Sequence, residues 1–358
     1  MVFYIRFLKT PRLQKHKSGG LSASALICIT TDLGDAFLSQ EVGVLVTLRL
    51  AHNEKVICQD RLQWHAGRRE LSIATAPLPA SIAKQSLIME VAASDPPPSK
   101  STLSDSLLGQ DNIPLVISGW SATFGGPQML VAGKLVERRF AVNDSVKLSI
   151  WEETGNSIAR HIWDAAVASV MYLQDTMVRD QQSSNSVLQK LLQAEHSSPL
   201  NVLELGSGCG IVGIAIAKLF PQCSVLLTDL PEVEEIVSKN IAAAQPAHGS
   251  KINYRPLEWE EEIPDDLFDT PSIDLIFVSD CTYNADSLPA LVSVLSRLVQ
   301  LSPHALIVVA LKRRHESESV FFELMQSAGL HDLHLHRMEL PSQHEQWDEI
   351  ELHSYGLQ

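Results

Sequence analysis

A glycine-rich turn in the second half of the chain limits the possible folds more than any other feature of the sequence. Residues 201–217 read NVLELGSGCGIVGIAIA, so an apolar run at Val202–Leu205 enters the turn and a helical pattern leaves it. Glycine adopts positive φ without steric cost and allows backbone N–H groups to approach a ligand closely. In open α/β sheets, ligands bind beside such turns, at the carboxyl ends of the strands. The turn therefore predicts a ligand site, although it could also serve only to pack a strand against a helix.

The spacing of the glycines separates two kinds of ligand. The dinucleotide fingerprint G-x-G-x-x-G would require a third glycine where this chain has Ile211. Glu204 precedes the first two glycines, Gly206 and Gly208. A carboxylate at that position has no role toward an anionic pyrophosphate. It suits a ligand that carries an α-ammonium group, such as S-adenosylmethionine.

Two further residues fit a nucleoside ligand. Asp229 closes the apolar run Ser224–Thr228 and lies roughly 20 residues after Gly208, where an acid binds ribose hydroxyls in nucleoside-binding α/β folds. Its alternative role is to cap the helical pattern that begins at Glu232, which aspartate does well. Trp259 follows the third strand position, where an indole can pack on adenine or, alternatively, in the core.

Strands and helices alternate around this turn. Further β-like runs lie at Ile273–Ser279 and Ala305–Leu311, helical patterns lie at Gly213–Leu219, Glu232–Ala244, Ser287–Leu301 and 316–328, and the chain ends with β runs at His331–Leu340 and Glu349–Leu357. Such alternation predicts parallel βαβ units in a sheet that is covered on both faces. We therefore expect a Rossmann-like α/β domain whose sheet ends in a two-stranded hairpin.

The first 95 residues have a different pattern. Short β-like runs occur at Val2–Leu8, Ala25–Thr30, Gly43–Leu50, Lys55–Gln59, Glu70–Ala76 and Leu87–Ala93. Regularly spaced strands without a helical period predict a small all-β sandwich or barrel. The following stretch is rich in proline, serine and aspartate and predicts a linker. We expect an accessory domain at 1–95, a linker at 96–127 and the α/β domain, which includes β-like runs at Val136–Val142 and Val146–Trp151, at 128–358.

Charge and cysteine usage restrict the partners and the compartment. The net charge of −14 argues against nucleic acid, because binding to phosphates depends on Lys and Arg. It favours basic partners, although net charge can also serve only to keep a protein soluble. The five cysteines form no C-x-x-C pair, so we expect reduced thiols and no metal site. No apolar run is long enough to span a membrane. We expect a cytoplasmic protein and leave the nucleus open. The basic N-terminus also permits a mitochondrial presequence, although Val2–Leu8 fits a strand better.

Together these residues resemble the seven-strand methyltransferases, and more narrowly the family 16 protein-lysine methyltransferases, from about residue 135 to 357. The resemblance rests on the glycine turn Glu204–Gly210, Asp229, Leu257-Glu258-Trp259, Asp280-Cys281-Thr282-Tyr283 and Trp163 within 159–166. It implies S-adenosylmethionine as the cofactor, held by Trp163, Glu204, Leu205, Gly206, Gly208, Asp229, Trp259 and Ser279. It also implies that Asp280 and Tyr283 face the acceptor. The β-rich first 95 residues lie outside the shared core, so the resemblance leaves open whether they bind a partner or position the substrate.

The chemistry of lysine methylation agrees with these roles. Methyl transfer is an in-line displacement, so the enzyme has to align the nucleophile with the methyl group. A lysine reacts as the free amine, although its pKa in solution is about 10.4. Asp280 can orient the amine, and the Tyr283 ring favours ammonium groups. Alternatively, Asp280 caps the following helix and Tyr283 serves ordinary packing.

Three functions remain open from the sequence. The first is a protein-lysine N-methyltransferase, and the second is a methyltransferase of protein histidine, protein arginine or a small molecule. The third is a cofactor-binding scaffold without turnover. We interpret the acidic run 258–269 and the basic run 312–315 as solvated surface, and His161, for which no partner is evident, as structural.

Overall fold

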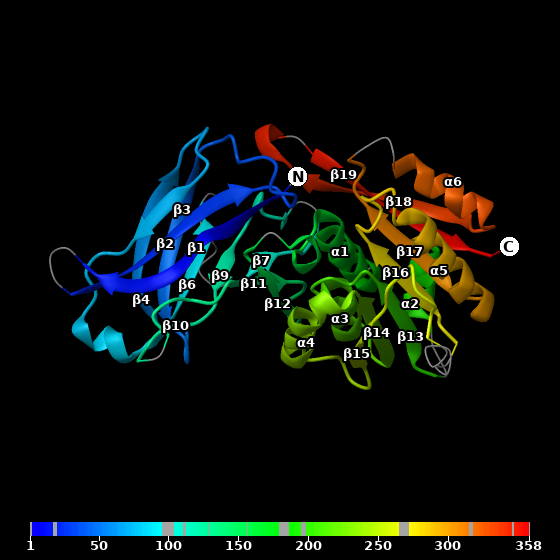
Figure 1. The fold of residues 1–358 in the computed structure, drawn as a ribbon, viewed down its shortest axis with the longest axis horizontal. Helices are drawn as coiled ribbons and strands as arrows, with labels where there is room; N and C mark the ends of the chain where they lie inside the picture. The colour runs from blue at the N-terminus through cyan, green and yellow to red at the C-terminus, as the bar shows by residue number, and fades with distance from the viewer. Residues whose placement is uncertain are drawn as a thin grey trace.

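The computed structural model describes most of the chain, in two parts that lie side by side (Figure 1). The described residues are 2–16, 20–94, 104–109, 112–127, 129–155, 157–178, 186–194, 198–264, 272–314, 318–345 and 347–357. A β-rich part comes first along the chain, and an α/β part follows it. Within these residues no helix is both long enough and apolar enough to cross a membrane.

The α/β part is built on a seven-stranded sheet with the order β15-β14-β13-β16-β17-β19-β18. Its strands are β13 (Leu200–Leu205), β14 (Cys223–Asp229), β15 (Lys251–Pro256), β16 (Leu275–Ser279), β17 (Leu306–Leu311), β18 (His331–Pro341) and β19 (Trp347–Gly356). The first five strands are parallel, and β19 and β18 form the antiparallel hairpin at one edge. This topology confirms the predicted Rossmann-like sheet. Of the seven strands, only β15 had no predicted range, although Trp259 was expected to follow a third strand; β15 is a partly exposed edge strand that contains charged residues.

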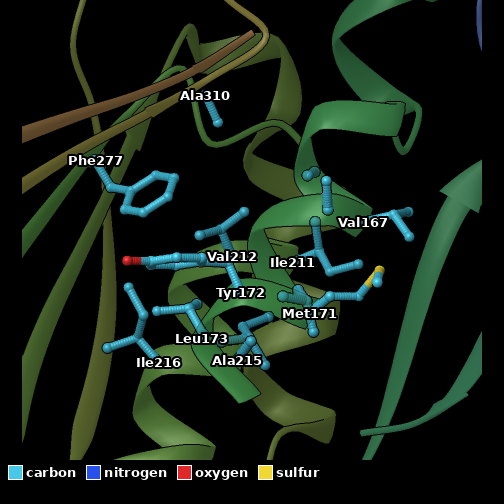
Figure 2. Packing of buried hydrophobic residues seen from close by; sticks show 14 of the residues in the cluster. Val167, Met171, Tyr172, Leu173, Ile211, Val212, Ala215, Ile216, Phe277 and Ala310 are labelled. Atoms are coloured by element: carbon cyan, nitrogen blue, oxygen red, sulfur yellow. The ribbon is translucent and has the colours of Figure 1, made fainter. Parts of the chain in front are cut away.

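Helices cover both faces of this sheet. They are α1 (Asp164–Val178), α2 (Val187–Gln193), α3 (Ile211–Leu219), α4 (Glu234–Ala243), α5 (Leu288–Leu301) and α6 (Ser319–Ser327). Successive side chains of a strand point to opposite faces, so Val202 joins one core cluster while Leu203 and Leu205 join the other. Figure 2 shows the first cluster, where side chains of α1 such as Met171 and of α3 such as Ile211 pack together beside the sheet.

The β-rich part contains two packed sheets. The smaller has the order β5-β2-β1-β8 and the larger β12-β11-β9-β6-β3-β4. Their strands are β1 (Phe3–Lys15), β2 (Leu21–Thr30), β3 (Val42–Leu50), β4 (Val56–Trp64), β5 (Leu71–Ala74), β6 (Ser86–Ala93), β7 (Asp105–Ser106), β8 (Val116–Ile117), β9 (Gly119–Ser121), β10 (Phe124–Gly125), β11 (Leu135–Ala141) and β12 (Lys147–Glu153). A separate core cluster joins β1 residues such as Ile5 to β3 residues such as Val46. The arrangement is the predicted all-β sandwich.

The sandwich extends further along the chain than the sequence suggested. The described residues of the expected linker, 104–109 and 112–127, contribute β7 to β10, which pair with strands of both sheets. β11 and β12, expected in the α/β domain, continue the larger sheet. The apolar residues near Trp120 explain the difference, because Val116 and Trp120 are buried and only tertiary pairing satisfies their backbone groups. The triple-proline stretch lies outside the described residues.

The two parts share one hydrophobic cluster. Val2 and Tyr4 of the N-terminal segment pack in the same cluster as Val167 of α1, consistent with the position of the N-terminus between the two parts in Figure 1. The Tyr4 hydroxyl also donates to Asp164 Oδ1 at 3.0 Å. The sandwich is therefore packed directly onto the start of α1.

Candidate active site

A cavity of about 690 Å³ opens at the carboxyl ends of β13, β14 and β16. Its lining contains nine of the residues predicted from the sequence: Trp163, Glu204, Gly206, Gly208, Asp229, Trp259, Ser279, Asp280 and Tyr283. The remaining predicted residue, Leu205, is fully buried in the core cluster under α5. Side chains from distant segments therefore converge on one cavity of the size that binds a small ligand.

The glycine loop between β13 and α3 comes close to two other segments. Gly206 has φ +65°, and a Cβ there would lie 2.4 Å from Cys281 Sγ. Gly208 has φ +53°, and a Cβ there would lie 2.9 Å from the carbonyl oxygen of Ala159. Both the backbone conformation and the limited space therefore require glycine at these two positions.

Asp229 holds this loop against the end of β14. Its Oδ2 accepts from the Gly208 N–H and its Oδ1 from the Leu230 N–H, both at 2.7 Å. Burial raises the pKa of Asp229, and these two donors act in the opposite direction. The alternative role as a helix cap is wrong, because a 3₁₀ turn at Pro231–Val233 separates Asp229 from α4, which Val233 precedes.

Three polar side chains are buried beside the loop. Glu204 is 1% exposed, and its Oε2 accepts from the Gly213 N–H at 2.8 Å. Burial, together with the Asp229 charge, raises the pKa of Glu204 to about 8. The hydroxyls of Ser207 and Ser279 have no hydrogen-bond partner within the part of the chain that the structure describes. This set suits a ligand that brings its own donors and a positive charge.

The raised pKa of Glu204 predicts a pH-dependent cost in stability. The folded pKa of about 8 lies above the ordinary 4.5, so the stabilising effect of the protonated group is full below pH 4.5 and is lost as the pH rises through 8. At pH 8.5 we expect ligand-free Glu204→Gln to be more stable than wild type by a few kcal/mol, since one pKa unit corresponds to about 1.4 kcal/mol. Urea unfolding at pH 8.5 and pH 5 checks this.

The gain should shrink at pH 5, where wild-type Glu204 is protonated. The exposed carboxyl of Glu235 on α4 provides the control, because Glu235→Gln should leave the stability profile unchanged. An equal gain from Glu204→Gln at both pH values would contradict the prediction.

Trp163 and Trp259 form parts of the cavity wall. Trp163 directly precedes α1 and lies with its ring centroid 5.5 Å from the guanidinium of Arg314. Trp259 packs against the hydrophobic cluster under α5 and also lines the cavity. Trp259 therefore belongs both to the edge of the core and to the cavity wall.

Asp280 directly follows β16 and is almost fully buried. It has φ +58°, a conformation that is uncommon outside glycine and asparagine-like residues. Its two oxygens lie 2.6 and 2.7 Å from the guanidinium nitrogens of Arg314. Burial raises the pKa of Asp280, and the pairing with Arg314 opposes that rise. Asp280 is not a helix cap, because Ser287 precedes α5. Tyr283 is 57% exposed and lines the cavity, so ordinary core packing does not account for it.

The interpretation of the basic run 312–315 as solvated surface was wrong for Lys312 and Arg314, whereas Arg313 is exposed. Lys312 is buried and bonds to Asp164 and Asp348 at 3.1 and 3.2 Å. Arg314 bonds to Asp280 and also to Asp32 of the β-rich part at 2.7 Å. His315 lies outside the described residues. Sequence reasoning missed Arg314 and Asp32 as parts of the site because they lie in segments that are far apart along the chain.

The structure also describes part of the acidic run 258–269 and the surroundings of His161. Glu260, Glu261 and Glu262 are exposed, as expected for a solvated run, while 265–269 lie outside the described residues. His161 has partners that the sequence did not reveal, since its Nδ1 lies 3.1 Å from Arg6 Nη1 and its Nε2 lies 3.0 Å from the Gly155 carbonyl oxygen.

Comparison with known proteins adds independent information. A family model described as lysine methyltransferase matches residues 142–328. A UPF0665 family protein of Schizosaccharomyces pombe is 28% identical over 89% of this chain and 91% of its own length, a match that has to include both parts. Protein N-lysine methyltransferase METTL21A of Mus musculus is 29% identical over 49% of this chain and 70% of its own. Protein-lysine N-methyltransferase EFM6 of Saccharomyces cerevisiae is 27% identical over 34% of this chain and 53% of its own.

Proposed function

Because this chain belongs to the lysine methyltransferase family, it is an S-adenosylmethionine-dependent methyltransferase, and we propose that its acceptor is a lysine on another protein. The observation that carries this proposal is the position of Asp280 and Tyr283 in the wall of the cavity beside the glycine loop. A buried carboxylate and an exposed aromatic ring together suit an amine that enters from outside.

The residues of the cavity suit the cofactor. We propose that the glycine loop, Asp229 and Trp259 hold the nucleoside, and that Glu204 and Ser279 lie within reach of polar groups of the cofactor. Bound S-adenosylmethionine supplies an electrophilic methyl group on a sulfonium sulfur. The buried polar atoms of Ser207 and Ser279, and the close approach permitted by Gly206, support this assignment.

Asp280 would act on the acceptor by orientation rather than as a strong base. An ionised carboxylate has about four lone pairs that can accept hydrogen bonds, and Arg314 donates to both of its oxygens. Asp280 can therefore accept a further hydrogen bond and direct the amine nitrogen toward the cavity. A lysine loses its proton more easily when it leaves water, since desolvation disfavours the charged form. The carboxylate therefore fixes the direction of the nucleophile while the cavity wall removes its hydration.

The rim of the cavity suits a protein acceptor. Ile158, Leu230 and Tyr283 line it and are 51%, 41% and 57% exposed. The carboxylates of Glu232 and Glu260 lie on the same rim. Exposed apolar side chains beside acids favour a basic segment with apolar neighbours over a fully enclosed metabolite.

Asp229→Ala should weaken binding of S-adenosylmethionine tenfold or more. The change leaves the backbone N–H groups of Gly208 and Leu230 without their acceptors, and an unpaired buried polar group costs about 1–3 kcal/mol. Calorimetric titration of the cofactor checks this. Asp286→Ala, in an exposed turn outside the cavity lining, provides the control. An unchanged dissociation constant for Asp229→Ala would contradict its proposed role.

The acceptor can be found by labelling. The full-length protein and its Asp280→Ala variant are incubated with methyl-labelled cofactor and a cell lysate, and labelled proteins are identified by mass spectrometry. A protein band that carries methyl-lysine and is lost with the variant supports the proposal. Detection of methyl-histidine, methyl-arginine or a labelled small molecule would show that the acceptor is not lysine. Cofactor binding without any methyl transfer would indicate a scaffold.

We also propose a cytoplasmic location and a revised domain boundary. Cys28, Cys58, Cys209, Cys223 and Cys281 are all free, which fits a reducing compartment. The strand pairing supports a sandwich that ends with β12 at Glu153 and a catalytic part that begins just before α1. Imaging of a tagged full-length protein tests the location.

A further inference from the structure

We propose that Asp32, in the β-rich sandwich, is a positioning residue of the methyltransferase site, where it holds Arg314 and, through it, Asp280. This inference rests on the proposed function of Asp280 as the residue that orients the acceptor. The sandwich, which lies outside the family's catalytic core, would then contribute a residue that fixes the geometry of the acceptor site.

The contacts of Asp32 place it inside the site rather than on the surface. It is 1% exposed and follows β2 in the loop that leaves the smaller sheet. Its Oδ2 accepts from Arg314 Nη2 at 2.7 Å and from the backbone N–H of Asp164 at 3.2 Å. The carboxylate therefore touches both the segment after β17 and the first residue of α1, which follows Trp163.

Arg314 connects two carboxylates that belong to different parts of the molecule. Its Nη1 donates to Asp280 Oδ1 at 2.6 Å, while its Nη2 is shared between Asp280 Oδ2 and Asp32 Oδ2, each at 2.7 Å. Guanidinium is planar and holds carboxylates in a fixed plane. The ring of Trp163 lies 5.5 Å from the guanidinium carbon. With Asp32 on one side and Trp163 beside it, Arg314 has one orientation that presents both nitrogens to Asp280.

The loop itself holds Asp32 firmly. Its second oxygen accepts from the Leu33 N–H at 2.8 Å, and its backbone carbonyl accepts from Arg6 Nη2 at 2.6 Å. The Thr31 hydroxyl donates to Asp35 at 2.7 Å and closes the turn. Asp32 is thus attached to strand β1 through Arg6, so the position of the sandwich determines the position of Arg314.

A purely structural role for Asp32 would show only in stability. Loss of its charge would weaken the contact between the two parts without changing how Asp280 faces the acceptor. The proposal requires more, because Arg314 without Asp32 can turn away from the bidentate arrangement. Misplacement of a reacting or orienting group by about 1 Å can reduce the rate roughly 100-fold.

Asp32→Asn in the full-length protein separates these roles. Asparagine has nearly the same shape and keeps the contact with Leu33, but it cannot hold the guanidinium by charge. We expect kcat for the labelled acceptor to fall tenfold or more, while the dissociation constant of the cofactor changes less than threefold. Asp35→Asn, in the same loop, is exposed and has no contact with Arg314, and its amide oxygen can still accept from the Thr31 hydroxyl that closes the turn, so this variant should keep wild-type kcat.

A second control addresses stability. Tyr4→Phe removes a buried hydrogen bond between the two parts without touching Arg314 or Asp280. It should lower the melting temperature and leave kcat unchanged. The inference is overturned if Asp32→Asn reduces kcat no more than Tyr4→Phe does at an equal loss of melting temperature.

A crystal structure of Asp32→Asn gives a readout that does not depend on activity. Displacement of Arg314 from at least one Asp280 oxygen supports the inference, and an unchanged bidentate pair overturns it. If the wild type binds the cofactor but labels no lysine, the proposed lysine acceptor is wrong, but the crystal structure still tests whether Asp32 holds Arg314. If Asp32→Asn does not fold, the Arg314→Lys variant is tested in its place. Lysine keeps the positive charge but cannot contact both carboxylates, so kcat should fall as well. A wild-type kcat for Arg314→Lys would overturn the inference.

Discussion

Asp280→Asn will reduce kcat for methyl transfer by roughly 10²–10³-fold, the size of effect expected when a positioned acid–base or orienting group is lost. The substitution keeps the shape of the side chain but removes its charge. Arg314 then loses the negative charge and one of the two oxygens that it contacts at 2.6 and 2.7 Å, and the substrate amine loses the carboxylate that we propose orients it. The loss should appear in kcat, measured with labelled cofactor and the purified acceptor at saturating concentrations.

Cofactor affinity separates this effect from damage to the whole cavity. We propose that Asp280 faces the acceptor and not the cofactor, so calorimetry should show a dissociation constant for S-adenosylmethionine within about threefold of wild type. Asp286→Asn lies in the exposed turn that follows and should have wild-type kcat. A variant of Asp280 with full turnover would show that the carboxylate does not act on the acceptor.

Glu152→Ala will destabilise the protein by about 3–5 kcal/mol, the cost of leaving a buried charge without its partner. Glu152 of β12 and Arg138 of β11 are both fully buried, and Arg138 Nε donates to Glu152 Oε1 at 2.7 Å. Burial alone would raise the pKa of Glu152, but the Arg138 charge and His161 hold it well below its ordinary value. Urea unfolding at pH 7, followed by tryptophan fluorescence, measures the loss.

The pH dependence and a neighbouring residue provide the controls. A depressed pKa means that the stabilisation by Glu152 is full above pH 4.5 and is lost as the pH falls through the folded pKa. The difference between wild type and Glu152→Ala should therefore shrink in acid. Glu153→Ala removes a partly exposed ion pair with Arg160 at 3.4 Å and should cost less than about 1 kcal/mol. Equal losses from both substitutions would contradict the prediction.

This pair also connects the sandwich to the catalytic part. Glu152 Oε2 accepts from the Ile162 N–H at 2.9 Å, and Ile162 directly precedes Trp163 in the cavity wall. Loss of Glu152 should therefore loosen the segment that enters α1. We expect the cofactor-bound form to lose at least as much stability as the ligand-free form, because a bound ligand stabilises the folded state in proportion to its affinity and a loosened cavity wall binds it more weakly.

The sequence by itself determined most of the α/β sheet, the glycine loop and nine residues of the cavity wall. These features are encoded locally: the apolar run before Gly206, the glycines themselves and the acid at Asp229 follow one another within a short stretch. Parallel strands bring their carboxyl ends to one edge, so Asp280 and Trp259 could be assigned to the same site from their positions after strands. The resemblance to lysine methyltransferases narrowed the chemistry further, and the family model agrees with it.

Only the tertiary structure showed that β7 to β12 pair with the strands of the sandwich and that Arg314 lies between Asp32 and Asp280. The residues near Val116 and Trp120 form strands because partner strands from distant segments pair with them, although the stretch that surrounds this apolar run is rich in proline, serine and aspartate and resembles a linker. Arg314 carried no sign in the sequence that its side chain would be largely withdrawn from solvent, because a run of basic residues is ordinarily solvated, yet this side chain is only 19% exposed. Its two partners, Asp32 and Asp280, are 282 and 34 residues away. A charge so far from its partners along the chain becomes stable in the interior only after folding has assembled them, and no local pattern records that.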